Sequence, residues 1–259
     1  MASGAIVLGP AYLGVLAALG GAAAAVAAAA RLRLSRAIVT ASGRALVQLA
    51  AVSLVITGVL TTWGTTAGFI AVMVVVAAAT SARRISHDRS AFWVTAALVA
   101  AVAPVLGLVL AAGTVPLRTI AVVPVAGILI GGAMTAASLS GRRVMDTLSD
   151  RHGEYEALLA LGFTEPEAVR ELCRLPAAQA LHPAVDQTRT VGLVTLPGAF
   201  VGVLLGGGGA VQAGATQLLV LIGLLVVETV AIVVVVELVA AGVIHAPRTA
   251  DLVRAGRAP

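Results

Sequence analysis

Long hydrophobic runs that carry almost no charge restrict the fold of this chain more than any other feature. Seven such runs lie over residues 5–30, 45–62, 63–82, 91–113, 119–140, 191–205 and 213–244, and nearly all charged residues lie outside them. About 20 apolar residues suffice for a helix to cross a bilayer, and in lipid a helix satisfies its own backbone hydrogen bonds. The runs lack the alternating pattern of a membrane β-barrel. We therefore predict an all-α polytopic protein in a lipid bilayer, with about seven transmembrane helices and a single transmembrane domain over residues 1–259.

The basic residues indicate how these helices are oriented. All 17 are arginines, and they lie at the ends of the hydrophobic runs. If the N-terminus is outside, only Arg118 falls on the outer side, and such an asymmetry is typical of the positive-inside rule. This predicts N-out and C-in orientation in the inner (plasma) membrane, with a cytoplasmic tail over residues 245–259. The arginines form no patch on a soluble domain, so a nucleic-acid partner is not expected.

The lack of lysine and the presence of a single cysteine limit the chemistry that the chain can perform. Without lysine it cannot contain a P-loop of the G-x-x-x-x-G-K-[ST] type, so ATP and Mg²⁺, if they are used, belong to a partner chain. The single cysteine, Cys173, excludes an internal disulfide and a zinc site built on cysteines. We expect no cofactor and no catalytic residue in this chain, and no metal ligands can be assigned.

A polar island over residues 141–189 separates the fifth and sixth runs and holds eight of the 12 acidic residues. Met145, Leu148, Tyr155 and Leu159 recur at helical spacing, which predicts a helix that continues from the fifth run. Gly162 is a candidate C-cap, and Thr164 to Glu167 has the form of a capping box that begins a second helix. The apolar side of this amphipathic helix is predicted to hold Ala168, Val169, Leu172 and Leu175. The island is therefore predicted to be a cytoplasmic helix-turn-helix. The residue pattern of the island fits an element that docks a partner and a solvated loop about equally well.

Four segments carry a resemblance to a known family: GRALVQ (43–48), VPVAGILIGGAM (123–134), LALGFTEPEA (159–168) and AVDQTRTVGLVTLPG (184–198). In this order they resemble the Fet-type iron-export ABC transporter permeases, which are related to the plant aluminium-tolerance half-transporter. Glu156-Ala157 followed by Gly162 is similar to the EAA loop of ABC permeases. Gly132, Ala199 and Phe200 depart from the family pattern, because the family usually has asparagine at the first position and methionine at the other two.

The resemblance implies that residues 1–259 form a permease domain, that two copies associate as a homodimer, and that a separate ATPase docks on segment 141–189. The cargo would be an iron-like metal cation or a metal complex. The docking residues implied are Glu154, Glu156, Ala157, Gly162, Phe163, Thr164, Glu165 and Glu167.

Several residues within the runs are candidates for a transport pathway or a hinge. Glu228 and Glu237 are the only acidic residues in a run, and carboxylates at membrane depth are costly enough to suggest function. They are nine residues apart, so they face opposite sides of one helix. Pro197-Gly198 should break the sixth helix. The full candidate set is Arg44, Gln48, Pro124, Met134, Pro197, Gly198 and Glu228.

Three functions are compatible with these residues. The first is the membrane subunit of an ABC exporter. The second is a proton-coupled secondary transporter that uses Glu228. The third is a non-transporting scaffold whose polar island recruits a cytoplasmic protein.

Overall fold

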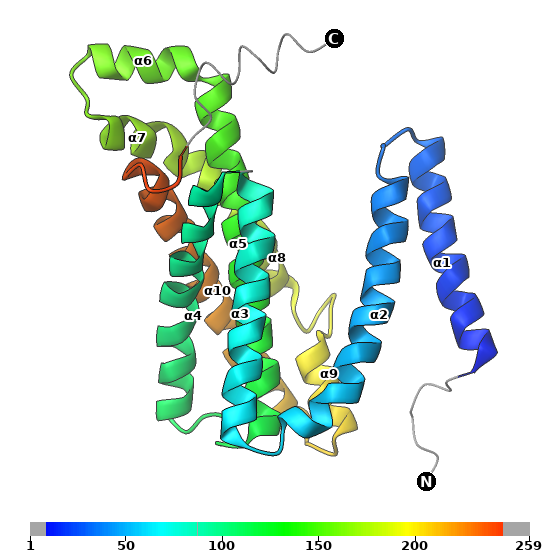
Figure 1. The fold of residues 1–259 in the computed structure, drawn as a ribbon. Helices are drawn as coiled ribbons and strands as arrows, with labels where there is room; N and C mark the ends of the chain where they lie inside the picture. Colours follow the sequence, from blue (N-terminus) through cyan, green and yellow to red (C-terminus); the bar gives the residue numbers. More distant parts are fainter. Residues whose placement is uncertain (1–8, 87, 246–259) are drawn as a thin grey trace. The chain divides into compact units, whose positions relative to one another are not determined.

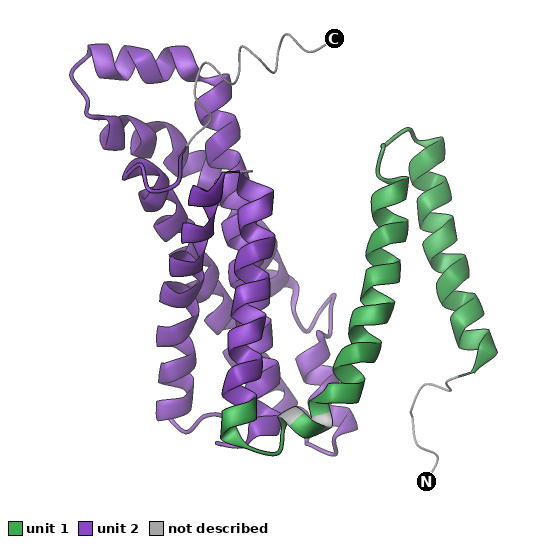
Figure 2. Ribbon diagram, viewed as in Figure 1, with its two compact units in different colours: residues 1–65 green, residues 66–259 purple. Residues whose placement is uncertain are grey.

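The computed structural model describes residues 9–245 with the exception of 87. The chain divides into two compact units, unit 1 over residues 1–65 and unit 2 over residues 66–259 (Figure 2). The described part of the chain is helical, and its only extended pairing is an isolated bridge between Val191 and Thr195. The predicted all-α class is therefore confirmed. The predicted tail 245–259 lies outside the described residues except for His245, as do the first four residues of the predicted run 5–30.

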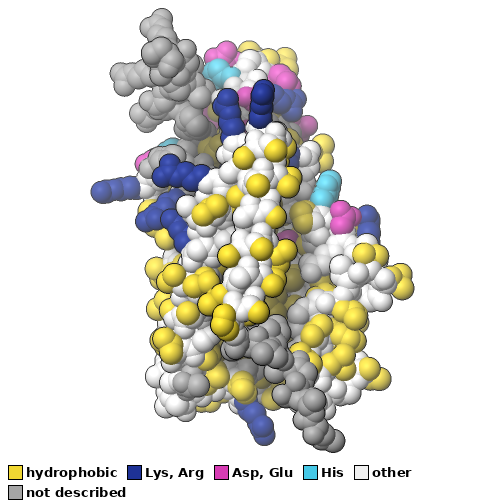
Figure 3. Space-filling view, turned by 90° about the vertical axis from the view of Figure 1, so that its right-hand side faces the viewer, with side chains coloured by type: hydrophobic (Ala, Val, Ile, Leu, Met, Phe, Trp, Pro, Cys, Tyr) yellow, Lys and Arg dark blue, Asp and Glu magenta, His cyan; other side chains and the backbone are white. Residues whose placement is uncertain are grey.

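Unit 1 is a hairpin of two long helices, α1 (Pro10–Ala29) and α2 (Ser35–Val59) (Figure 1). Pro10 lies in the first turn of α1, where its missing N–H costs no hydrogen bond. Ala27 is the only buried residue of α1. Figure 3 shows hydrophobic side chains over much of the exposed surface, with charged side chains restricted to small groups. Such a surface suits contact with lipid or with another membrane helix.

Unit 2 contains the remaining helices. They are α3 (Trp63–Ile85, from Thr66 onward), η1 (Arg89–Trp93), α4 (Val94–Ala111), α5 (Thr119–Asp150), α6 (His152–Ala160), α7 (Glu165–Ala178), η2 (Gln179–Leu181), α8 (His182–Thr190), α9 (Gly198–Leu205) and α10 (Ala210–Ala240). Helix α10 is central, because it packs against α4, α5, α7 and α9. The core at these contacts is rich in alanine, including the fully buried Ala97, Ala133 and Ala231. Small side chains let membrane helices approach closely.

Six helical segments in the described part of the chain are long and apolar enough to cross a membrane: α1, α2, α3, η1 with α4, α5 and α10. The sixth predicted helix, over residues 191–205 with a break at Pro197-Gly198, is helical only after that break. Residues 191–197 leave the helix, with Gly192 at φ 82° and the Val191–Thr195 bridge, and α9 has only eight residues. At 1.5 Å per residue α9 is about 12 Å long, which is far short of a bilayer core.

This broken segment nevertheless makes the pass that was assigned to the sixth hydrophobic run. Helix α7 contacts the C-terminal parts of α5 and α10, at Val144 and Glu237. The first turns of α5 and α10 instead share a cavity with α9. The chain between α7 and α10 therefore travels from one end of α5 to the other (Figure 1). We call the end of unit 2 where α6 and α7 lie the polar end, and the end near α9 the opposite end.

The break falls at the predicted residues. Pro197 is the N-cap of α9 and Gly198 is its first residue. Proline has no N–H to donate to a preceding turn, which explains why the helix restarts here. Interrupted helices at membrane depth occur where protein or a cavity surrounds the exposed backbone. The orientation of the chain across the membrane stays a prediction.

Packing between α3 and α5 gives a first testable prediction. A Cβ atom at Gly141 would lie 2.6 Å from Cγ1 of the buried Ile85, so alanine cannot fit without moving that side chain. We expect Gly141→Ala to destabilise unit 2 by about 1–3 kcal/mol, the usual cost of overpacking. Gly131→Ala is the matched control, since no atom lies within 4 Å of its added Cβ. Thermal unfolding in detergent should show a lower Tm for Gly141→Ala only, and equal Tm values would contradict this packing.

Candidate functional site

The α6–α7 hairpin, residues 152–178, lies at the polar end of unit 2. Helix α5 ends at Asp150, and Arg151, with φ −108° and ψ 32°, changes the direction of the chain before α6 begins. Figure 1 shows α6 and α7 side by side, with the turn between them away from α5. The predicted helix-turn-helix is thus present, with one added break at Arg151 that the sequence did not indicate.

The turn of the hairpin is fixed by local hydrogen bonds. Gly162 has φ 96°, and the N–H groups of Gly162 and Phe163 donate to the carbonyls of Leu159 and Leu158. This is a Schellman motif, which favours glycine at the left-handed position. The N–H of Thr164 then donates to Glu167 Oε2 at 2.9 Å, and the reciprocal bond completes a capping box. Both predicted caps are confirmed.

All eight residues predicted to dock the ATPase are exposed, but their carboxylates differ in what they do. Glu167 belongs to the capping box, and the Thr164 backbone N–H lowers its pKa. Glu154 accepts a hydrogen bond from Arg151 Nε at 2.7 Å, which lowers its pKa. Glu156 lies 3.3 Å from His152 Nε2. Glu154 and Glu167 therefore stabilise the conformation of the hairpin, whereas Glu165 begins α7 at the exposed turn.

Two exposed apolar side chains lie near the turn, of which the sequence analysis named Phe163 and missed Leu161. Leu161 is 77% exposed and Phe163 is 41% exposed. A leucine directly before a left-handed glycine is a usable signal, because the Schellman turn directs the chain away from the helix surface at that point. On α7, the periodicity suggested that Leu175 is buried with Val169 and Leu172. Leu175 is in fact 73% exposed, so that part of the periodic pattern was misleading.

Helix α7 is attached to the ends of both α5 and α10. Val169, Leu172 and Cys173 are buried in the core of unit 2. Arg170 forms a bidentate ion pair with Glu237 on α10, with Nε to Oε1 at 3.0 Å and Nη2 to Oε2 at 2.8 Å. This contact raises the pKa of Arg170. Both side chains are about half exposed, and pairs of this kind contribute about 0–1 kcal/mol. Apolar burial therefore supplies most of the attachment, and the ion pair sets its geometry.

The only cysteine gives a second prediction. Cys173 is fully buried between α7 and α5, with Sγ 4.0 Å from the Val144 carbonyl oxygen, and burial raises the pKa of its thiol to about 11. Because the thiolate is the reactive form, we expect N-ethylmaleimide to leave Cys173 unmodified at pH 7.5 in the folded protein. Mass spectrometry should show complete modification only after unfolding. Fast labelling of the folded protein would mean that α7 is not docked on α5.

A cavity of about 800 Å³ lies at the opposite end of unit 2. The first turns of α5 and α10 line it together with α9, and it brings together the predicted hinge residues Pro124 and Gly198. Gln217 lies nearby in α10, where its buried side-chain oxygen accepts a hydrogen bond from the Phe200 N–H at 3.2 Å. The sequence analysis missed Gln217, although a glutamine in an apolar run is a recognisable signal.

The other pathway candidates of unit 2 do not line this cavity. Pro197 lies at the start of α9, and Met134 contributes its carbonyl oxygen to hydrogen bonds from Ser81 and Ser138. Glu228 lies half-buried in the middle of α10, and its Oε1 is 3.0 Å from where a Cβ on Gly132 would be. In the described part of the chain no hydrogen bond or ion pair engages its carboxylate. Arg44 and Gln48 are exposed on α2 in unit 1.

The described residues contain no group of three or more His, Cys, Asp or Glu side chains that could hold a metal ion. The metal ligands that the sequence left unassigned stay unassigned.

Comparisons with known proteins relate this chain to membrane proteins. An uncharacterised protein family, UPF0014, matches residues 10–244. The chain is 31% identical over 150 residues to the UPF0014 membrane protein STAR2 of Oryza sativa subsp. japonica. It is 29% identical over 150 residues to the Protein ALUMINUM SENSITIVE 3 of Arabidopsis thaliana, and 32% identical over 115 residues to the Probable iron export permease protein FetB of Escherichia coli K12.

The alignments cover 58%, 58% and 44% of this chain, and 53%, 55% and 44% of the three relatives in the same order. The chain thus matches about half the length of each relative. No solved structure matches the chain.

Proposed function

Because this chain belongs to the uncharacterised protein family UPF0014, we propose that it is the membrane-spanning permease subunit of an ABC transporter. It is a multi-pass membrane protein, and we place it in the inner (plasma) membrane as a homodimer. A separate ATPase subunit binds ATP and Mg²⁺ and docks on the α6–α7 hairpin, which faces the cytoplasm. The name of the FetB relative supports a metal cation, iron-like or in a complex, as the exported substrate.

One observation carries this proposal: an exposed, doubly capped turn sits on a helix that is packed against the ends of two apolar helices. Leu161 and Phe163 provide an apolar contact surface at the turn, with Glu165 beside it. A partner that pulls on this turn moves α7, and α7 is attached to α5 through Cys173 and to α10 through Arg170. Displacement of the hairpin on ATP binding would therefore shift both helices, as a switch between two states of access requires.

The pathway in this proposal runs along α10. Glu228 provides a carboxylate at mid-helix, and the cavity beside Pro124 and Gly198 provides an opening at the opposite end. The broken segment before α9 gives a place where the chain can bend.

The proposal is tested by reconstituting the chain in liposomes with and without its candidate ABC ATPase. We expect the two chains to co-purify, and iron release from the vesicles to require ATP and both chains. If the two chains co-purify but no tested metal is transported in an ATP-dependent way, the result would support docking of the ATPase and contradict metal export. Failure to co-purify would contradict the docking itself.

No hydrogen bond or ion pair within residues 9–86 and 88–245 engages the Glu228 carboxylate, which favours one second candidate, a proton-coupled transporter that needs no partner. Transport by the chain alone, driven by a pH gradient and lost in Glu228→Gln, would support that candidate over the ABC permease. Binding of an unrelated cytoplasmic protein without any transport would instead identify the chain as a scaffold.

A further inference from the structure

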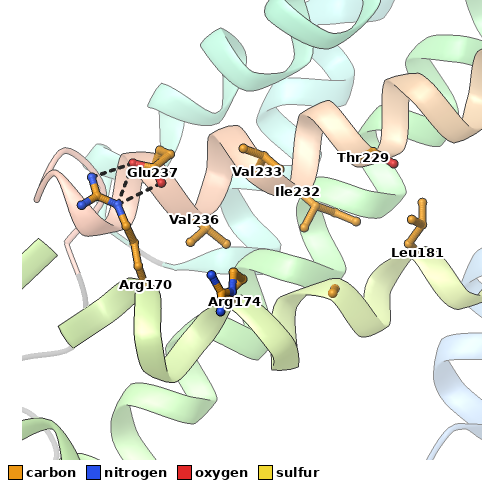
Figure 4. Close-up of a pocket in the computed structure, with 9 residues that line it drawn as sticks. Arg170, Arg174, Leu181, Thr229, Ile232, Val233, Val236 and Glu237 are labelled. Carbon is orange, nitrogen blue, oxygen red and sulfur yellow. Dashed lines mark hydrogen bonds and ion pairs between the residues drawn. The ribbon is translucent and has the colours of Figure 1, made fainter. Parts of the chain in front are cut away.

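A groove of about 300 Å³ lies between α7 with η2 on one side and α10 on the other. Figure 4 shows the two helical segments side by side, with Arg170 opposite Glu237 and Leu181 near Thr229. The chain therefore runs in opposite directions along the two walls. From Glu237 to Thr229 the α10 wall extends about 12 Å, at 1.5 Å per residue. The remaining lining residues are Arg174, Ala178, Ile232, Val233 and Val236.

Polarity changes along the length of this groove. Toward the polar end of unit 2, the walls carry the ion pair between Arg170 and Glu237. Farther along, the walls are Ile232, Val233 and Leu181, and Val233 is 54% exposed. These residues belong to α10, which is apolar enough to cross a membrane, and to the amphipathic segment beside it. A groove with a charged mouth and an apolar interior is complementary to an amphiphile.

The charge at the mouth selects the sign of that amphiphile. Arg174 follows Arg170 by one helical turn on α7 and is exposed. In the described part of the chain no hydrogen bond or ion pair engages its guanidinium. The single negative charge of Glu237, which is paired with Arg170, cannot neutralise both arginines of the groove. The groove therefore carries an excess positive charge beside an apolar wall, and the guanidinium group is well suited to bidentate binding of phosphate.

We propose that this groove binds one anionic phospholipid. The phosphate contacts Arg174 at the mouth, and an acyl chain lies along Ile232 and Val233. Basic pockets beside membrane helices recognise anionic headgroups in this way. A free phosphate would satisfy Arg174 but leave the apolar wall uncovered, so the groove favours the lipid. A bound lipid would also bridge α7 and α10 next to the ion pair, which would make the attachment of the hairpin sensitive to membrane composition.

The test is native mass spectrometry of the full-length chain purified in detergent, with added phosphatidylglycerol or phosphatidylcholine of the same acyl chains. We expect retention of phosphatidylglycerol by the wild-type chain, and roughly tenfold weaker retention in Arg174→Ala, the loss that corresponds to one charge-assisted hydrogen bond. Val233→Phe should also reduce retention, because it fills the apolar part of the groove without changing charge.

Arg189→Ala is the matched control, since Arg189 is an exposed arginine on α8 that pairs with Asp186 outside the groove. It should retain phosphatidylglycerol as the wild-type chain does. Equal retention of the two lipids, or unchanged retention in Arg174→Ala, would overturn the proposal. Displacement of the lipid by inorganic phosphate alone would overturn the role of the acyl chain. A lipid-free dimer whose crosslinks place a second copy against Val233 would show that the groove is a subunit contact instead.

Discussion

Gly162→Val is expected to reduce ATP hydrolysis by the complex at least about tenfold, while the transmembrane helices stay folded. Gly162 holds φ 96°, and a β-branched side chain is strongly disfavoured in that region. Loss of the Schellman turn would redirect Phe163 and Thr164, and with them the surface that we propose meets the ATPase. The measurement is the metal-stimulated ATPase rate of the reconstituted complex, together with the Tm of the permease.

Gly153→Val is the matched control for this substitution. Gly153 lies in the first turn of α6, and no atom lies within 4 Å of a Cβ added there. The control should keep near-normal ATP hydrolysis. If both valine variants lose activity equally, the left-handed turn has no special role. If neither does, the hairpin is not the docking element.

Charge reversal at the α7–α10 ion pair is expected to have the second large effect. Arg170→Glu would place two carboxylates where Arg170 and Glu237 now lie within 2.8 Å. We expect the ATPase to remain bound, because the hairpin turn is untouched. We expect ATP hydrolysis to fall about tenfold, because α7 loses the contact that sets its geometry on α10. The effect on Tm should be small, since half-exposed pairs contribute about 0–1 kcal/mol to stability. One variant would thus separate the effect on ATP hydrolysis from the effect on stability.

The double reversal, Arg170→Glu with Glu237→Arg, makes this test specific. It restores an ion pair with the opposite polarity and should recover most of the ATPase rate. Maleimide labelling of Cys173 offers an independent readout, because separation of α7 from α5 would expose that thiol. Arg189→Glu, on the neighbouring α8, controls for the change in net charge. A double variant as inactive as Arg170→Glu would show that the pair does not transmit motion.

Much of this protein follows from interactions that are local in the sequence. The hydrophobic runs become helices because lipid offers the backbone no other hydrogen-bond partners. The caps at Gly162 and Thr164 depend on bonds between residues at most five positions apart. The restart of the helix at Pro197 follows from the missing N–H of proline. For these features the sequence alone was sufficient, because their energetics involve only neighbouring residues and the solvent.

Contacts between distant residues determined the rest. Hydrophobicity alone predicted a helix over residues 191–205, but only the tertiary structure shows that α8, an extended turn and α9 make that pass. Periodicity placed Leu175 on the buried face of α7, yet the position of α5 and α10 left it exposed. Arg170 and Glu237 are 67 positions apart, so no local pattern could pair them. The length and composition of each segment determine whether it forms a helix in lipid. Side-chain packing across the whole of unit 2 determines which helix faces contact one another.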